Sequence, residues 1–221
     1  MEGSLRARYD QTYSGIVDSV LKMGSMVDGA IQNSLSSLQN RDIALAQEVV
    51  ENDEQINSLR FQIEEACLVL IATQQPAAKD LRNVVSAMNI VVDLERMGDH
   101  ASGISKTVIR MGDRPLLKPL IDIPRMAHIA REMLRSSLKA YVDRDPELAK
   151  AVAPRDEEMD FLYKAIFDEL VGIMASTPDS VERATYLLWT AHNLERIGDR
   201  VTNISERVVF MSTGDLEELN I

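Results

Sequence analysis

A duplication within the chain constrains its fold more than any other feature of the sequence. The segment LERMGDHASGISKTV at 94–108 recurs as LERIGDRVTNISERV at 194–208, an offset of 100 residues. Upstream the two halves align at an offset of 103, and the difference falls in a turn that reads ATQQPAAKD in one half and ASTPDS in the other. Length changes are tolerated best in loops. The sequence therefore predicts two tandem copies of one structural unit.

Each copy has the apolar spacing of three helices. In the first copy, apolar residues recur every three or four positions through 13–38, 45–70 and 81–109. This spacing gives each helix one apolar stripe, and the short polar turns between the stretches make neighbouring helices antiparallel. In the second copy we expect helices over about 124–143, 146–175 and 179–211.

Prolines separate the two copies. The stretch RPLLKPLIDIP at 114–124 contains three prolines, and proline interrupts helices. We therefore expect a first three-helix repeat over 1–113, a Pro-rich connector over 114–124 and a second three-helix repeat over 125–221. The predicted fold class is all-α, with six long helices in two tandem antiparallel three-helix bundles.

Composition and charge narrow the classes of function. The formal net charge of −11 opposes binding to the phosphate backbones of nucleic acids, and it is compatible with metal cations or a basic protein partner. The single Cys67 cannot form an intrachain disulfide, which fits a reducing compartment. Residues 1–16 lack the apolar core of a signal peptide, and the apolar stretch 84–92 is too short to span a bilayer. We expect a cytoplasmic protein that reaches a membrane only through a partner.

The third helix of each copy carries an acidic pair within its apolar stripe. Glu95 occupies a stripe position and Asp99 follows one helical turn later, and Glu195 and Asp199 repeat the arrangement. Buried carboxylates are costly when uncompensated, and two neighbouring ones repel each other. Water, Arg or Lys partners, or a bound cation could offset this cost, and hard cations prefer clustered oxygen ligands.

The middle helix of each copy could complete the set. Asp156 and Asp160 have the same four-residue spacing, and their counterparts in the first copy are Asp53 and Asn57. These four residues fall at the edge of the apolar stripe. If the middle and third helices face each other, each copy could gather up to four oxygen-bearing side chains. Because Asn57 replaces an acid, we expect a weaker or less populated metal site in the first copy.

A plain surface role is the alternative for these charges. Acidic residues at helical spacing are usually solvated, and Glu195 could pair with Arg196 or Arg200 on the surface. Arg96 and Arg196 directly follow the two glutamates of the pairs. They could orient a carboxylate, contact a partner or remain surface residues.

The sequence offers no recognisable catalytic constellation. His100 adjoins the first acidic pair, but its counterpart is Arg200, so it is not a repeated ligand. There is no Glu-x-x-His element, P-loop, dinucleotide fingerprint or His-Glu-x-x-His motif. Gly98 and Gly198, inside predicted helices, indicate either the close approach of a neighbouring helix or room for a site. We predict that the protein is not an enzyme.

The repeated LERMGD and LERIGD segments resemble those of the PhoU proteins, which accompany the bacterial phosphate-specific transporter. The resemblance covers essentially the whole chain. It implies pseudo-twofold symmetry between the bundles, usually a homodimer, and multinuclear iron or zinc sites held by the acidic motifs. Carried onto this sequence, the two sites would comprise Glu195, Asp199, Asp156 and Asp160 in one copy, and Glu95, Asp99 and Asp53 in the other, where Asn57 departs from the acidic pattern.

The resemblance also implies a regulatory function. Proteins of this family are thought to couple the ATPase subunit of the phosphate ABC transporter to a membrane sensor histidine kinase. They hold the phosphate-starvation response off when phosphate is ample, and they restrain uptake. The alternatives are a carboxylate-bridged metal-dependent enzyme, a hydrolase or oxidase, and a metal-free helical adaptor.

Overall fold

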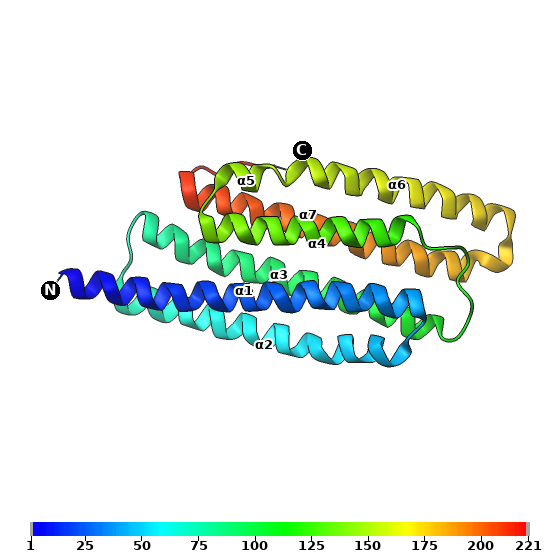
Figure 1. Cartoon of the computed structure of the whole chain (residues 1–221), viewed down its shortest axis with the longest axis horizontal. Helices are drawn as coiled ribbons and strands as arrows, with labels where there is room; N and C mark the ends of the chain where they lie inside the picture. Colours follow the sequence, from blue (N-terminus) through cyan, green and yellow to red (C-terminus); the bar gives the residue numbers. More distant parts are fainter. Residues whose placement is uncertain (1, 220–221) are drawn as a thin grey trace.

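Six long helices make up most of the structure (Figure 1). The computed structural model describes residues 2–219, with side chains from residue 6 onward. The long helices are α1 (Glu2–Asn40), α2 (Ile43–Gln74), α3 (Lys79–Met111), α4 (Asp122–Asp143), α6 (Ala153–Ser176) and α7 (Val181–Thr213), and the short ones are α5 (Pro146–Lys150) and the 3-10 helix η1 (Pro178–Ser180). Residues 2–219 contain no β-strand. The all-α prediction is confirmed.

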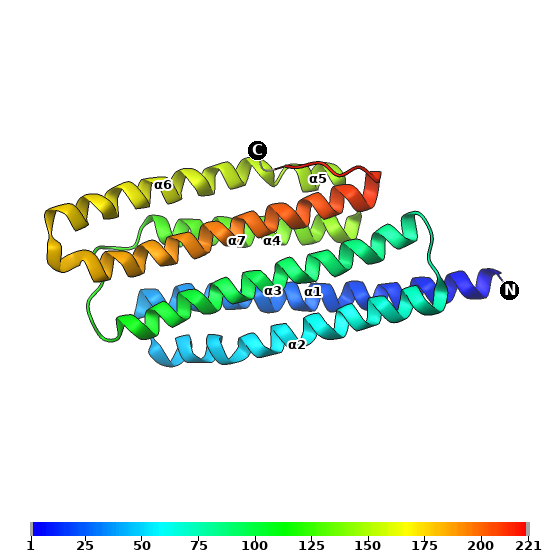
Figure 2. The same ribbon diagram turned by 180° about the vertical axis from the view of Figure 1, so that it is seen from behind.

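The helices form one elongated body built from two units. Helices α1 and α4 lie side by side in Figure 1, and α3 and α7 run behind them, as Figure 2 shows from the other side. Helix α2 packs on α1 and α3 along one edge, and α6 packs on α4 and α7 along the other. The two predicted three-helix bundles are therefore present, and they meet through the α3–α7 and α1–α4 contacts.

The second unit departs from the prediction at its middle helix. The apolar spacing predicts one helix over 146–175, but a turn at residues 151–152 separates α5 from α6. Pro154 lies in the first turn of α6, where its missing N–H is harmless. In a continuous helix its ring would clash with the carbonyl group one turn earlier. The single-helix prediction is wrong for this reason.

Helix α4 also begins at Asp122 rather than near 124, because Pro124 is tolerated in a first turn.

The duplication extends to the turns that start the middle helices. Arg41 and Arg144 both adopt a left-handed conformation with φ of 55°. The next residue in each unit caps the following helix. The Asp42 carboxylate accepts a hydrogen bond from the backbone N–H three residues later at 2.9 Å, and Asp145 does the same at 3.0 Å. Such N-caps contribute about 1 kcal/mol each. Both units therefore use the same local chemistry to reverse the chain.

The apolar stripes of both units merge into one core. Each long helix contributes side chains that are almost completely buried, such as Val20, Ile63, Leu94, Met126, Leu170 and Ile197. Burying such a side chain stabilises the fold by roughly 1.5–3 kcal/mol. The Cys67 thiol also lies in this core, and burial raises its pKa to about 12.

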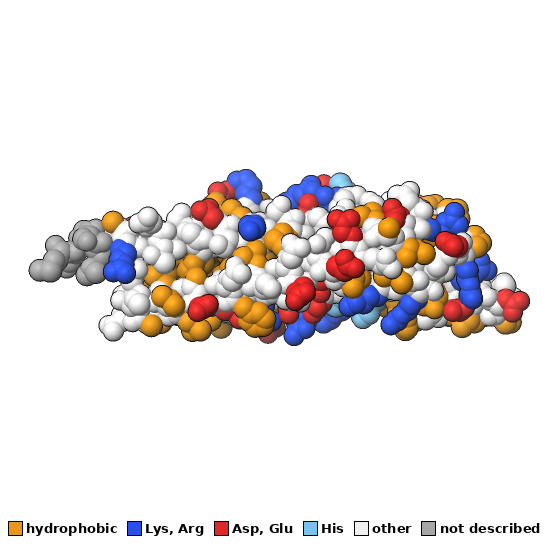
Figure 3. Space-filling view, turned by 90° about the horizontal axis from the view of Figure 1, so that it is seen from below, with side chains coloured by type: hydrophobic (Ala, Val, Ile, Leu, Met, Phe, Trp, Pro, Cys, Tyr) orange, Lys and Arg blue, Asp and Glu red, His pale blue; other side chains and the backbone are white. Residues whose placement is uncertain are grey.

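Charged side chains of both signs intermingle on the surface. Figure 3 shows this on the face seen from below, where hydrophobic side chains lie between the charges. Within residues 2–219, no helix has both the length and the apolar character that crossing a bilayer requires.

A cluster of ion pairs joins the two units through α1 and α4. Arg131 of α4 donates two hydrogen bonds to the Asp28 carboxylate of α1, at 2.8 and 3.0 Å, and Arg135 donates a third at 2.9 Å. Partial burial alone would raise the pKa of Asp28. The hydrogen bonds from the two guanidinium groups outweigh burial and hold this pKa below its ordinary value of 3.8. Charge-assisted, bidentate geometry makes this a strong contact.

We expect Asp28→Asn to lower the free energy of unfolding at pH 7 by roughly 1–2 kcal/mol, because two guanidinium groups lose their counter-charge. A lowered carboxyl pKa stabilises the fold above the ordinary value, and this stabilisation is lost as the pH falls through the folded-state pKa. The difference between wild type and variant should therefore shrink as the pH falls below 3.8, and disappear below the folded-state pKa.

Urea denaturation at pH 7 and pH 3 measures this difference. Asp10→Asn is the matched control, since Asp10 pairs with Arg6 on the exposed surface and should change stability by less than about 0.5 kcal/mol. Equal effects of the two substitutions would contradict the assignment of Asp28 as the stronger contact.

Candidate metal centres

The first acidic set lies between α2 and α3. Glu95 and Asp99 of α3 act electrostatically on Asp53 of α2, and Asn57 follows Asp53 one turn later in the same helix. Asp53 approaches the backbone of α3 at Gly98, where an added Cβ would lie 3.1 Å from Asp53 Oδ1. Burial raises the pKa of Asp53, and the charges of Asp99 and Glu95 raise it further. The structure therefore brings the three predicted carboxylates of the first unit into one neighbourhood.

The second acidic set lies between α6 and α7 and is more enclosed. Asp156 of α6 sits against Gly198 of α7, where an added Cβ would lie only 2.7 Å from Asp156 Oδ1. The Thr202 hydroxyl donates to the other oxygen of this carboxylate at 3.2 Å. Asp156 is 2% exposed, so the expectation that it lies at the edge of the stripe is wrong. Close helix approach at Gly198 places Asp156 inside the interface, whereas Asp160, one turn later, is exposed.

Carboxylate charge is concentrated in this second set. Burial, together with the charges of Asp160, Asp199 and Glu195, raises the pKa of Asp156 to about 6, against the hydrogen bond from Thr202. Burial and the neighbouring Asp199 also raise the pKa values of Glu195 and Asp160. The four predicted residues of the second unit therefore act electrostatically on one another.

Several oxygens of both sets are buried without a hydrogen-bond donor. They are Asp53 Oδ1, Asn57 Oδ1, Glu95 Oε2, Asp156 Oδ1 and Glu195 Oε2. Orphaned carboxylate and amide oxygens are a suitable donor set for a cation. Across residues 2–219, however, no three His, Cys, Asp or Glu side chains converge closely enough to enclose a metal ion. The donor chemistry fits a metal, and the side chains would have to turn toward a common point to bind one.

The two repeated arginines orient the second acid of each pair. Arg96 Nη1 donates to Asp99 Oδ2 at 3.0 Å, and Arg196 Nη1 donates to Asp199 Oδ2 at 2.7 Å. Arg96 Nε also lies 3.5 Å from Glu95 Oε2. Of the roles open to these arginines from sequence, the structure supports that of orienting a carboxylate.

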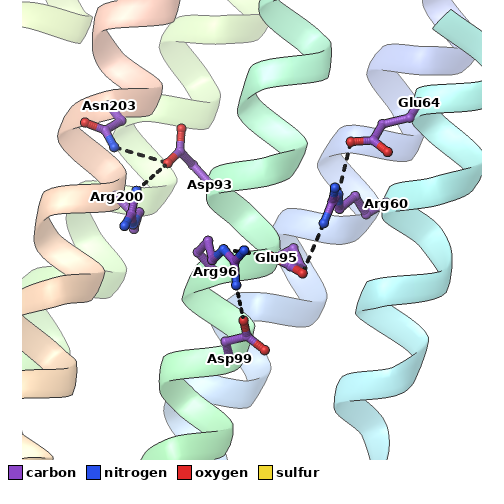
Figure 4. Close-up of polar contacts among 8 residues, drawn as sticks. All are labelled: Arg60, Glu64, Asp93, Glu95, Arg96, Asp99, Arg200 and Asn203. Carbon is purple, nitrogen blue, oxygen red and sulfur yellow. Dashed lines mark hydrogen bonds and ion pairs between the residues drawn. The ribbon is translucent and has the colours of Figure 1, made fainter. Parts of the chain in front are cut away.

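Arg60 of α2 was not predicted as part of the first set. Its Nη1 donates to Glu95 Oε1 at 3.2 Å, and its Nε donates to Glu64 at 3.0 Å (Figure 4). At the offset of 103 its counterpart is Tyr163. A comparison of the positions at which the two copies differ would have identified this residue.

Glu195, the counterpart of Glu95 in the second unit, contacts a histidine instead of an arginine of the middle helix. Glu195 Oε2 lies 3.3 Å from Nδ1 of His192, an imidazole that is charged only when protonated. The His192 ring in turn lies beside the Tyr163 ring, with centroids 5.9 Å apart. His192 is half-exposed and touches the acidic set.

Polar contacts between α3 and α7 lie close to both acidic sets. Asp93 of α3 accepts hydrogen bonds from Asn203 at 3.1 Å and Arg200 at 3.5 Å (Figure 4). The repeat-related contact joins His100 Nδ1 to Asn193 Oδ1 at 3.0 Å. Burial lowers the pKa of His100. These contacts tie the two units together along their pseudo-twofold relation.

The buried charge of Asp156 predicts a stability change on its removal. A carboxyl pKa raised from 3.8 to about 6 destabilises the fold as the pH rises through this interval, because the folded state must give up its proton. In metal-free protein, Asp156→Asn should therefore raise the free energy of unfolding at pH 7 by roughly 1–2 kcal/mol. The gain should vanish near pH 4.

Urea denaturation in the presence of a chelator, at pH 4 and pH 7, measures this gain. Glu157→Gln, at the exposed neighbouring position, is the control and should change stability by less than about 0.5 kcal/mol. If Asp156→Asn instead lowers the free energy of unfolding at pH 7, the charge of Asp156 does not destabilise the metal-free fold.

Comparison with known proteins places both units in one family. The PhoU domain family matches residues 20–108 and again 123–208. The chain is 36% identical over 216 residues to the phosphate-specific transport system accessory protein PhoU homologue of Clostridium acetobutylicum, covering 97% of this chain and 99% of that protein. It is 38% identical over 208 residues to the homologue of Caulobacter vibrioides, covering 94% and 90%.

Solved structures agree with the sequence comparison. The crystal structure of PhoU from Pseudomonas aeruginosa superposes with a TM-score of 0.90 at 32% identity, covering 94% of this chain and all of the other. The phosphate transport system regulatory protein PhoU of Streptococcus pneumoniae superposes with a TM-score of 0.89, also at 32% identity, covering 95% and 99%. Two matched domains, relatives matched along at least 90% of their length and the shared fold establish that the chain belongs to the PhoU family of phosphate-transport accessory proteins.

Proposed function

We infer that the protein is a negative regulator of phosphate uptake and of the phosphate-starvation two-component response. In this proposal it acts in the cytoplasm as an adaptor between the ATPase subunit of the phosphate ABC transporter and a membrane sensor histidine kinase. The observation that supports it is the match of both units to relatives named as accessory or regulatory proteins of phosphate transport. A homodimer would present two copies of each surface to these partners.

Metal binding is the second part of the proposal. Asp156, Asp160, Glu195 and Asp199 would hold iron or zinc ions in the second unit, and Asp53, Asn57, Glu95 and Asp99 would do so in the first. The support is the set of buried oxygens without donors between the middle and third helices of each unit. When bound, the metal would supply positive charge between these helices, while Arg96 and Arg196 keep the aspartates oriented.

A carboxylate-bridged enzyme is the competing proposal. It needs a proton-transfer residue beside the metal. The sequence candidate, His100, has its Nδ1 engaged by Asn193 of the other unit, and burial lowers its pKa. These contacts favour a binding protein over a hydrolase or oxidase. Turnover of phosphate esters or oxygen by metal-loaded protein, abolished by Glu195→Gln, would reverse this preference.

The adaptor proposal predicts two physical partners. The purified chain should retain the transporter ATPase subunit and the cytoplasmic part of the sensor kinase in pull-down experiments. Deletion of the gene should raise phosphate-responsive reporter expression in phosphate-rich medium. Failure to capture either partner, together with unchanged reporter output, would remove the proposal.

The metal proposal predicts a loss of stability on chelation. Protein purified without an affinity tag or chelator should contain at least about one transition metal ion per chain by elemental analysis. Its melting temperature should fall when the metal is stripped, because a ligand bound to the folded state stabilises it by mass action. Less than one metal per chain, with melting unchanged by chelation, would instead support the metal-free adaptor.

A further inference from the structure

The two acidic sets differ in the positive charge that the protein itself supplies. In the first unit, Glu95 and Asp99 pair with the guanidinium groups of Arg60 and Arg96, while Asp53 feels the charges of both acids and the opposing charge of Lys106. In the second unit, the carboxylates of Asp156, Asp160, Glu195 and Asp199 lie near the guanidinium group of Arg196, which pairs with Asp199 at 2.7 Å. Counting only these groups, three carboxylates against two guanidinium groups leave one negative charge in the first set, and four carboxylates against one guanidinium group leave three in the second.

Arg60 creates this difference by direct contact. The Glu95 carboxylate is held between two guanidinium groups, with Arg60 Nη1 3.2 Å from one oxygen and Arg96 Nε 3.5 Å from the other (Figure 4). Glu64 fixes Arg60 from the far side at 3.0 Å, and the Arg60 guanidinium also stacks 5.2 Å from the Phe61 ring. The Arg60 side chain is only 23% exposed. A positive charge thus already occupies the Glu95 side of the first set.

The second unit has aromatic residues at the same places. Tyr163 and Phe167 replace Arg60 and Glu64 at the offset of 103, and their rings contact each other with centroids 6.4 Å apart. Neither can neutralise the Glu195 carboxylate. Asp156, 2% exposed, keeps one oxygen without a donor. This orphaned oxygen is aimed at Gly198, beside the Glu195–Asp199 pair. Orphaned oxygens occur in both sets, but Asp156 is more deeply buried than its counterpart Asp53, and the second set lacks a counterpart of Arg60.

We propose that the Arg60 guanidinium group takes the place of a metal ion beside Glu95 in the first site. Metal therefore binds first and most tightly at the second site. This inference rests on the metal-binding part of the proposed function and restricts it. Metal can enter the first site only by displacing the Arg60 guanidinium from Glu95. Asn57, in place of Asp160, removes a further charge from the first site. The two repeats are then specialised, with one kept together by a guanidinium group and the other by a metal ion.

Exchanging the two residues tests the proposal directly. Arg60→Tyr gives the first site the residue of the second, and Tyr163→Arg does the reverse. Zn²⁺ is the probe, titrated into metal-stripped full-length protein by calorimetry, with bound metal counted by elemental analysis. Asp53→Asn and Asp156→Asn assign each binding phase to a site. Arg8→Tyr, on the exposed surface of α1, matches the loss of charge without touching either site.

The expected results separate the two sites. Asp156→Asn and Tyr163→Arg should each weaken the tightest phase at least about tenfold, the scale of one charge-assisted hydrogen bond. Asp53→Asn and Arg8→Tyr should leave that phase within about twofold. Arg60→Tyr should strengthen binding at the first site at least about tenfold, and a further Asn57→Asp should increase it again. Arg60→Gln provides a second variant if the tyrosine disturbs folding, as judged by circular dichroism and melting.

Other outcomes would overturn the proposal. Equal losses on Asp53→Asn and Asp156→Asn, or a first site unaffected by both Arg60 variants, would show that Arg60 does not control binding. Absence of Zn²⁺ binding by wild type would overturn both this inference and the metal proposal. The adaptor proposal is tested separately, by the pull-down experiments and the phosphate-responsive reporter.

Discussion

Carboxylate charge buried between neighbouring helices is the constraint on which the rest of this structure depends. Asp53 and Asp156 project from the middle helices onto the third helices at Gly98 and Gly198, where an added Cβ would lie 3.1 and 2.7 Å from a carboxylate oxygen. The apolar core on either side is dense enough to hold these helices together in spite of the charge. The acidic sets are therefore placed by the packing of the whole bundle.

The two units meet this constraint with different chemistry. The first places Arg60 against Glu95, whereas the second leaves Asp156 partly unsatisfied and Glu195 next to a histidine. Between them, the Asp93–Arg200 and His100–Asn193 contacts tie α3 to α7. Duplication thus preserved the backbone arrangement, while substitutions at a few contact positions changed the charge that each unit carries.

Sequence reasoning was most successful where residues repeat. The LER and GD segments located α3 and α7, and the offset of 103 identified which residues of α2 and α6 face them. It failed where the copies differ, because Arg60 and Pro154 are not repeated in the other copy and repetition was the signal followed. The burial of Asp156 was also missed, since periodicity assigns a face to a residue but does not determine how closely two helices approach.

The position of Cys67 has a practical consequence for following the motions of this protein. Cys67 is the chain's only thiol, it is fully buried in α2, and burial raises its pKa to about 12. An alkylating reagent reacts with an accessible thiolate, so it can modify this residue only after α2 has swung away from the bundle. The rate of alkylation therefore reports how often the first unit opens, and the measurement needs no introduced label.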